Sequence, residues 1–476
     1  MRKASALFLI LLSPALTFAQ ATALPPTRPF AFTHVTVIDV TGAPSKSGMT
    51  VIVAGNRITD VGKTGKVQIP KGTQVFDARG KFLIPGLWDM HVHSMYDGRP
   101  EFFFPLLLAN GVTGVRELAS TFPLEKINNI RREILTGKVL GPRFGAVTGK
   151  IIEGHSQAND RRPEFEYVAT AEEARRLVRS RKQQGADFIK VYNWLPRDVY
   201  LAIADEAKKQ GIPFAGHIPV SMTAAEIADA GQKSVEHLVG ILHALSSREA
   251  ELLAALRDSP TRPQFSYLAS SVAAAESYDS KKAKALFARF KHNGTWHCPT
   301  YALRRARAYM SEPFIRNDER LKYIPRSVRE TWAKGPILRD EASFRKVYLK
   351  DLELAGLMQR AGVGILAGTD TGFGNFYTIP GFSLHDELEL LVIAGLTPLQ
   401  SLQAATLNPV KFLGLERTLG TVAKGKIADL LLLDANPLEN IKNTRRINAV
   451  VANGRYLARE ELDSLLANVE TAANKK

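Results

Sequence analysis

Two histidines one residue apart, His91 and His93, follow a Pro-Gly pair near the first quarter of the chain. Residues i and i+2 of a β-strand point to the same face, so both imidazoles and Asp89 are predicted to share one face. The other face is apolar and comprises Trp88, Met90 and Val92. Imidazoles on one face of a core strand indicate a metal site. Two solvated histidines on a half-exposed strand are the plainer interpretation.

Further side chains that can bind a metal stand at the ends of short apolar segments. They are Lys190, His217, His237 and Asp370. Taken singly, each has an ordinary structural explanation, such as a rim histidine, an ion-paired lysine or an aspartate that starts a turn. Placed together at the same ends of successive strands, they favour a first-row metal site, with zinc as the best match to these ligand types.

The middle of the chain alternates helical and strand patterns. Predicted helices at 171–184, 197–210 and 223–230 each lead through a glycine into predicted strands at 187–192, 212–217 and 234–237. Such units imply parallel strands with right-handed crossovers, and about eight of them form a (β/α)8 TIM-like barrel whose active site lies at the carboxyl ends of the strands. An open doubly wound sheet is the alternative, but no Gly-rich phosphate loop follows any strand.

Both ends of the chain are rich in β-branched, alternating segments, at 33–38, 49–54, 428–434 and 447–454. They predict a small β-sandwich built from the two ends. The expected organisation is a signal peptide at 1–19, a composite sandwich at 20–80 and 415–458, the barrel at 81–414 and a helical tail at 459–476. Within the barrel, the 133 residues from His237 to Asp370 exceed two βα units, so we expect a seventh strand and an insertion at 304–342 that forms a lid or substrate wall.

The first residues have the pattern of an export signal. Arg2 and Lys3 precede an apolar run at 4–16, and small residues end at Ala19. The run is too short to span a bilayer, and no later segment is a candidate span. We therefore expect an exported protein, periplasmic or secreted. The single cysteine, Cys298, excludes an intramolecular disulfide and is expected to pack as a small core residue.

The net charge of +16 raises the question of an anionic partner. Lys and Arg are nevertheless interspersed with Glu along predicted helices such as 171–184, and no basic run with interleaved aromatics occurs. We expect a small-molecule or dipeptide substrate, no nucleic acid and no membrane span. Assembly into a homo-oligomer stays open.

The motifs at the strand ends resemble those of the amidohydrolase superfamily of metal-dependent hydrolases, most of all its imidazolonepropionase-like and zinc prolidase-like branch. They are HVH at 91–93, FIKVY at 188–192, AGH at 215–217, VEHL at 235–238, LAGTDTG at 366–372, LQAATLNP at 402–409 and GTVAKGKIADL at 420–430. The similarity runs from about residue 30 to 457. One departure is Glu117, where many relatives carry Asp.

This resemblance implies a two-zinc centre. His91 and His93 would bind the first zinc with Asp370, and His217 and His237 would bind the second. Lys190 would be carbamylated and bridge the two ions, because a carbamate is anionic whereas a free lysine is a cation. A metal-bound hydroxide would attack an amide carbonyl, with Asp370 transferring the proton as general acid and base.

The resemblance also implies substrate-binding positions at His155 and Tyr192. His297, near the end of the expected seventh strand, is a further candidate, together with Thr300. His385 matches a common motif of the family, although helix capping is an alternative.

The sequence therefore predicts an exported metal-dependent amidohydrolase that cleaves an amide or peptide bond of a dipeptide or an N-acyl amino acid. A mononuclear cyclic amidohydrolase of the imidazolonepropionase type, or a deaminase, needs fewer ligands and is the alternative. A non-catalytic envelope binding protein on a degenerate barrel is a third hypothesis, but such a barrel should have lost ligands.

Overall fold

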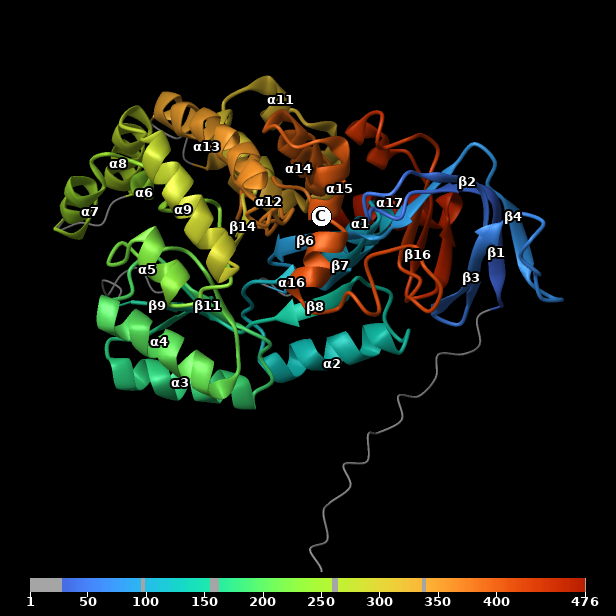
Figure 1. The fold of residues 1–476 in the computed structure, drawn as a ribbon, viewed down its shortest axis with the longest axis horizontal. Helices are drawn as coiled ribbons and strands as arrows, with labels where there is room; N and C mark the ends of the chain where they lie inside the picture. Colours follow the sequence, from blue (N-terminus) through green and yellow to red (C-terminus); the bar gives the residue numbers. More distant parts are fainter. Residues whose placement is uncertain (1–27, 96–98, 155–161, 259–263, 336–339, 476) are drawn as a thin grey trace, which may run out of the picture.

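The computed structural model describes residues 28–95, 99–154, 162–258, 264–335 and 340–475. The predicted signal peptide and His155 lie outside these residues. Figure 1 shows strands from both ends of the chain side by side at one edge of the molecule, next to a larger part in which strands and helices alternate. Within the described residues, no helix is both long enough and apolar enough to cross a membrane.

The strands from the two chain ends form one eight-stranded sheet in the order β17-β16-β15-β5-β1-β2-β3, with β4 beside β1. Their bounds are β1 (Phe30–Val37), β2 (Lys46–Ala54), β3 (Arg57–Lys63), β4 (Gln74–Asp77), β5 (Phe82–Pro85), β15 (Leu430–Leu433), β16 (Ile447–Ala452) and β17 (Arg455–Ala458). The two ends meet where β15 pairs antiparallel with β5. Phe32, Val51, Leu430 and Val451 share one hydrophobic cluster, which joins the two ends of the chain into one unit.

The remaining strands are parallel and bear the predicted site. They are β6 (Leu87–Val92), β7 (Val112–Glu117), β8 (Arg143–Val147), β9 (Ile151–Glu153), β10 (Phe165–Tyr167), β11 (Ile189–Val191), β12 (Phe214–Gly216), β13 (Ser234–Glu236) and β14 (Trp296–Cys298). The backbone N–H of Asp187 donates to Val147 O and so joins β8 to β11. The segment 364–371 bridges in parallel to β14 through Ile365 and to β6 through Thr371. The eight parallel segments that follow one another around a ring are β6, β7, β8, β11, β12, β13, β14 and 364–371, as a TIM-like arrangement requires, with β9 beside β11 and β10 beside β9.

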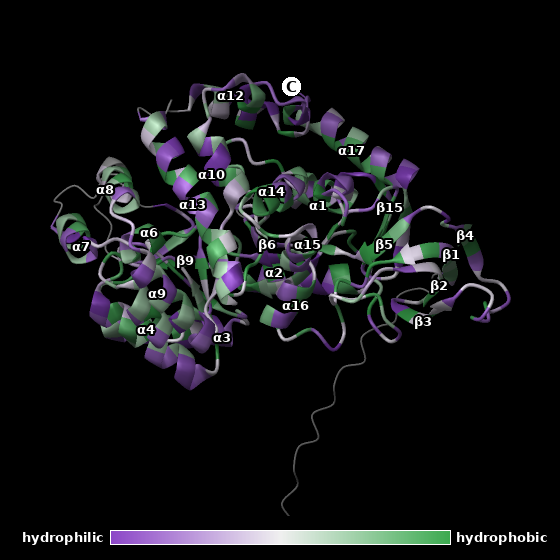
Figure 2. Cartoon of the chain, turned by 45° about the horizontal axis from the view of Figure 1, so that its top comes forward, coloured by the Kyte–Doolittle hydropathy of each residue, from purple (hydrophilic) through white to green (hydrophobic). Residues whose placement is uncertain are grey.

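Helices cover the outside of this ring with their apolar faces inward, as the green inner and purple outer surfaces in Figure 2 show. They include α1 (Pro100–Ala109), α2 (Leu124–Leu135), α3 (Ala171–Gln183), α4 (Arg197–Gln210), α5 (Ala224–Asp229), α14 (Phe382–Ile393), α15 (Pro398–Ala404) and α16 (Leu407–Phe412), and α17 (Arg459–Ala473) forms the tail. Thr170 and Thr223 start α3 and α5 with capping boxes to Glu173 and Glu226. These caps account for the accuracy of the predicted helix starts.

The long interval before segment 364–371 contains β14 as the seventh strand, but extra helices flank it on both sides. Those before β14 are α6 (Ile241–Ala244), α7 (Glu249–Arg257), α8 (Gln264–Glu276) and α9 (Ser280–Asn293). Those after it are α10 (Tyr301–Ala308), α11 (Pro313–Arg316), the 3-10 helix Glu319–Tyr323, α12 (Arg326–Lys334) and α13 (Glu341–Ala361). The sequence predicted only the second group, because an amphipathic helix looks the same whether it packs on a barrel or on an insertion.

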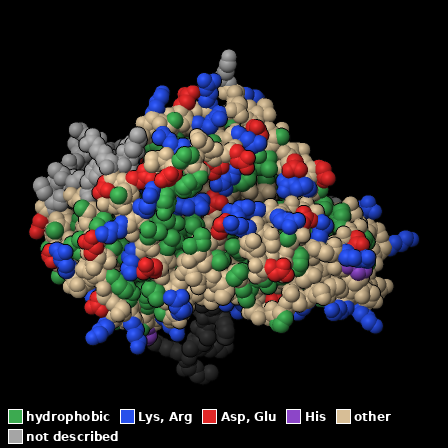
Figure 3. All heavy atoms as spheres, turned by 90° about the horizontal axis from the view of Figure 1, so that it is seen from above, with side chains coloured by type: hydrophobic (Ala, Val, Ile, Leu, Met, Phe, Trp, Pro, Cys, Tyr) green, Lys and Arg blue, Asp and Glu red, His purple; other side chains and the backbone are tan. Residues whose placement is uncertain are grey.

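The charged side chains do not gather into one basic surface on the face drawn in Figure 3. Lys and Arg side chains alternate there with Asp and Glu. This mixed pattern agrees with the charge interleaving in the sequence.

Candidate metal centre

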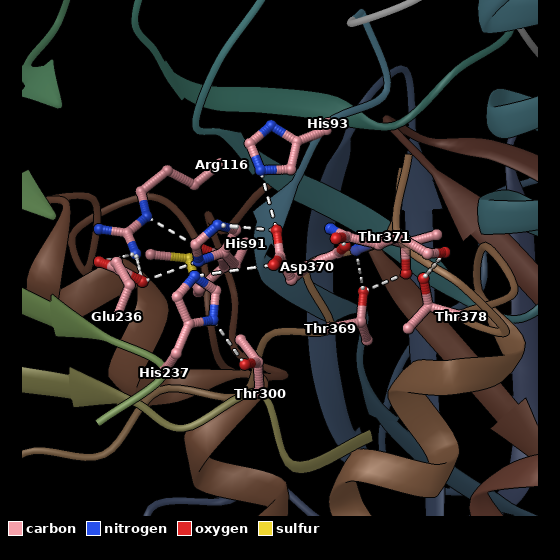
Figure 4. A network of polar contacts seen from close by, with 12 residues as sticks. His91, His93, Arg116, Glu236, His237, Thr300, Thr369, Asp370, Thr371 and Thr378 are labelled. Atoms are coloured by element: carbon pink, nitrogen blue, oxygen red, sulfur yellow. Dashed lines mark hydrogen bonds and ion pairs between the residues drawn. The ribbon is translucent and has the colours of Figure 1, made fainter. Parts of the chain in front are cut away.

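Three histidines at the ends of two strands, His91 and His93 at β6 and His237 after β13, converge on Asp370 (Figure 4). The Nε2 atoms of His91 and His93 lie 3.1 and 2.9 Å from Asp370 Oδ1. His237 Nε2 lies 3.6 Å from the other oxygen, Oδ2. The side chains of His91 and Asp370 are 0% and 8% exposed, so water screens these contacts little. The sequence predicted each of these four residues as a metal ligand, and the structure brings them together.

A separate partner holds the Nδ1 atom of each of three site histidines. When Nδ1–H donates, the lone pair of the neutral ring is on Nε2, the atom that faces the centre. His91 Nδ1 lies 3.0 Å from Glu236 Oε2, His237 Nδ1 lies 2.7 Å from Thr300 Oγ1, and His217 Nδ1 lies 2.7 Å from Asn193 Oδ1. Sequence reasoning missed Glu236 and Asn193, although each directly neighbours a predicted motif residue.

Glu236 is fixed by the barrel floor below His91. Arg116 donates to both of its carboxylate oxygens at 2.9 and 3.0 Å, and neither side chain is more than 1% exposed. The guanidinium lies between the rings of Phe188 and Phe412, at 5.7 and 5.1 Å. Cys298 also lies near His91 and Glu236, but the Glu236 oxygens already accept hydrogen bonds, so this second grouping is not an open metal site.

Burial sets the protonation of these groups. It lowers the pKa of His217 and of His237 well below the usual value, which favours neutral rings. Burial alone would raise the pKa of Asp370, but its close contacts with His91, His237 and His93 hold it well below the usual value. Neutral imidazoles and an ionised carboxylate are the forms that bind a divalent cation.

Several buried atoms of this set have no aligned hydrogen-bond partner among the described residues. They are His91 Nε2, His217 Nε2 and Asp370 Oδ1. Buried polar atoms rarely stay unsatisfied, and here a lone pair of His91 faces a carboxylate. A cation between them would turn this repulsion into attraction. The described residues therefore fit a divalent metal with nitrogen and oxygen ligands.

The backbone is strained where the ligands leave their strands. His237, Thr300 and Asp370 have φ values of 59°, 52° and 56°, in the left-handed region that non-glycine residues rarely adopt. Each such residue costs about 1–3 kcal/mol and persists only where the surroundings enforce it. A Cβ at Gly368 would meet Cys298 Sγ at 2.5 Å, so the LAGTDTG motif needs a glycine next to the centre.

Lys190 is buried at 1% exposure on β11, and its charge interacts with Glu236 and Asp370. Burial lowers its pKa to about 8, against the opposing effect of these two carboxylates. No carboxylate of the described residues lies within ion-pair distance of it.

Tyr192, on the same face, places its ring 4.1 Å from His217 and 4.9 Å from Phe165. Burial raises the pKa of Tyr192, so its hydroxyl stays a donor.

Two predicted orientations differ from the structure. The ring of His297 lies 4.6 Å from Phe290 of α9, fully buried, and is not brought to the cluster, so the structure does not support substrate contact for this residue. The strand period explains this, because its neighbour Cys298 takes the inward face. Asp89 accepts hydrogen bonds from Thr369 N and Oγ1 at 3.0 and 2.6 Å and does not face the centre. An irregular register in β6 between Asp89 and Val92 separates it from His91.

Two further residues from the sequence have supporting roles. Glu117 accepts hydrogen bonds from Ser94 N and Oγ at 3.0 and 2.6 Å, which fixes the turn directly after His93. His385 lies inside α14, not at its start, and its ring bridges Thr444 Oγ1 and Asn110 O at 2.9 and 3.0 Å. Capping was therefore the wrong explanation for His385, which ties α14 to its neighbours.

Comparison with known proteins agrees with this geometry. The model of the amidohydrolase family matches residues 82–457. The chain belongs to the amidohydrolase family. It is a hydrolase of carbon–nitrogen bonds. It is 25% identical over 430 residues to an ochratoxinase of Aspergillus niger, covering 77% of this chain and 73% of the relative.

Solved structures show the same fold. A bottromycin amidohydrolase superposes with a TM-score of 0.72 at 23% identity, covering 94% of this chain and 91% of that one. A Xaa-Pro dipeptidase with bound methionine gives a TM-score of 0.64 at 20% identity, covering 90% of this chain and all of the other. At these identities the likeness concerns the fold and does not transfer a substrate.

Proposed function

We propose that this amidohydrolase cleaves an amide or peptide bond of a small substrate, such as a dipeptide or an N-acyl amino acid, in a metal-dependent reaction with Asp370 as general acid and base. The observation that carries the proposal is the convergence of His91, His93 and His237 on the one ionised carboxylate of Asp370.

In this proposal His91, His93 and Asp370 hold one zinc ion, and His217 and His237 hold a second. Lys190 would bind the metal as a carbamate, which suits a buried lysine that has no ion-pair partner among the described side chains. When bound, the ions supply a Lewis acid that lowers the pKa of water and polarises a carbonyl oxygen.

Asp370 is placed to move the proton. Its buried carboxylate, in contact with His91 and His93, would accept a proton from the attacking water. The same carboxyl group would then deliver the proton to the leaving amine. Tyr192 and Phe165 form an aromatic wall beside His217 that limits the space for substrate.

The test is a panel of N-acyl amino acids and dipeptides, including Xaa-Pro, Xaa-Arg and Xaa-Lys, with the wild type and Asp370→Asn. We expect turnover by the wild type and a fall in kcat of about 10²–10⁴-fold in the variant. The metal content of both proteins serves as the control for an intact centre. Ring opening of cyclic amides or deamination, with no dipeptide turnover, would replace the proposal by the cyclic amidohydrolase or deaminase alternative.

We also propose that the protein is exported with cleavage after Ala19, from the basic start and apolar run described above. Sequencing the amino terminus of protein recovered from the periplasm or medium should give Gln20 as the first residue. An unprocessed Met1 in a protein that stays inside the cell would contradict this.

A further inference from the structure

Three arginines of α10 differ in their partners. Arg304 pairs with Asp351 and also donates to His237 O at 2.8 Å. Arg305 pairs with Asp386 at 3.3 Å. Arg307 makes no ion pair with any residue that the structure describes, and its one hydrogen bond there is a long one of 3.5 Å to Asn375 Oδ1. Among these three cations, Arg307 is thus the one that has no ion-pair partner in the part of the chain that the structure describes.

The position of Arg307 ties it to the metal centre. Helix α10 starts directly after Thr300, the hydroxyl partner of His237. Residues i and i+3 of a helix lie on one face, so Arg307 follows Arg304, which reaches His237 O. Its contact Asn375 in turn donates to Asp370 O at 2.6 Å. The guanidinium therefore stands next to the loop that carries the proton-transfer residue.

The charge of Arg307 acts on the interior of the site. Asp370 and Tyr192 are the anionic and phenolic groups with which it interacts electrostatically, while Arg304 repels it. The residue is partly buried, so its guanidinium has lost part of its hydration without forming an ion pair with any described carboxylate. A guanidinium in this state favours a planar anion that can accept two parallel hydrogen bonds.

We propose that Arg307 is a specificity-determining residue that binds a free carboxylate of the substrate beside the scissile amide. This inference rests on the proposed amide hydrolysis and narrows its substrates to N-acyl amino acids and peptides whose C-terminal carboxylate lies near the cleaved bond. The neutral hydroxyl of Tyr192, whose ring lies 4.1 Å from that of His217, is a second donor within the same site.

The test compares substrates that differ only in this carboxylate, such as N-acetyl-L-phenylalanine and N-acetylphenethylamine. The wild type should prefer the acid. In Arg307→Ala, kcat/KM for N-acetyl-L-phenylalanine should fall by about 100-fold, mainly through KM. The value for N-acetylphenethylamine, which lacks the carboxylate, should stay within about twofold. Arg307→Lys should lose less of this kcat/KM, about tenfold, because lysine keeps the positive charge but lacks the two parallel N–H donors of the guanidinium. The control is Arg326→Ala on the exposed face of α12, where the arginine pairs with Glu330.

A binding measurement separates this inference from the proposed function. N-Benzenesulfonyl-L-phenylalanine and N-benzenesulfonylphenethylamine resist hydrolysis and are titrated by calorimetry into the metal-loaded protein. The wild type should bind the carboxylic acid at least about tenfold more tightly than the compound that lacks the carboxylate, and Arg307→Ala should bind both alike. Failure to hydrolyse any amide overturns the proposed function while this comparison still decides on Arg307. Equal binding of both compounds by the wild type, or equal losses on both in Arg307→Ala, overturns the inference.

Discussion

Glu236 accepts a hydrogen bond from Nδ1 of His91 at 3.0 Å while Arg116 holds the same carboxylate from the other side. The pair turns Nε2 of His91 toward Asp370 and fixes its lone pair there. Such outer partners orient a metal-binding imidazole and raise its basicity. Glu236 and Arg116 are therefore expected to raise the affinity of the centre for a metal ion without binding the ion themselves.

Replacing Glu236 by Gln keeps the shape of the side chain and removes its charge. We expect zinc affinity to fall by about 10–100-fold, measured by competition with a chelator. Because Arg116 loses its countercharge in this variant, Thr300→Val offers a second test that disturbs only the partner of His237. Glu330→Gln, on the exposed face of α12, is the control. Unchanged affinity in both site variants would contradict an orienting role.

The proposed carbamate on Lys190 can be detected directly. Protein loaded with zinc in ¹³C-bicarbonate should show a carbamate resonance by carbon NMR, because the buried lysine with its lowered pKa is readily uncharged. Lys190→Arg should lack the resonance and should retain less metal per chain. An active wild type with one metal per chain and no carbamate signal would favour the mononuclear alternative.

Much of the site was predictable because its ligands stand at the carboxyl ends of parallel strands. His91, His93, His217, His237 and Asp370 all follow short apolar segments, and parallel strands bring such ends together. Glu236 and Arg116 also have a signal, a charge inside an apolar strand, but their pairing requires knowledge of which strands are neighbours. The same rule failed for His297 because the inward face of β14 there belongs to Cys298.

The roles of residues on the inserted helices could not be predicted from the sequence. Arg307 lies on α10, after a strand end, and nothing in its local pattern distinguishes it from Arg304 or Arg305. That it has no ion-pair partner among the described residues is visible only once Asp351 and Asp386 are seen to pair with the other two arginines. Tertiary pairing of distant segments, not local propensity, decides such roles.

Glu387 on α14 gives a pH-dependent stability prediction. Burial raises its pKa from 4.5 to about 8, although it accepts a hydrogen bond from Ala302 N at 2.7 Å. Between these values the folded state keeps a proton that the unfolded state has lost, so stability falls as pH rises through this window and levels off above pH 8. The loss amounts to a few kcal/mol, at about 1.4 kcal/mol per pKa unit.

Glu387→Gln removes this titration. The Tm of the variant minus that of the wild type should therefore increase from pH 5 to pH 8 in thermal scans of metal-free protein, while Glu330→Gln should follow the wild type. Parallel wild-type and Glu387→Gln curves across this range would show that Glu387 is ionised in the folded protein.

The central claim is that amide hydrolysis depends on a metal held by the His91, His93, His237 and Asp370 cluster. The most direct measurement is turnover of the N-acyl amino acid and dipeptide panel by one preparation before chelation, after chelation and after zinc is restored. The account predicts loss of turnover on chelation and recovery with zinc, with metal content rising in step. Full turnover by the metal-free protein would contradict it.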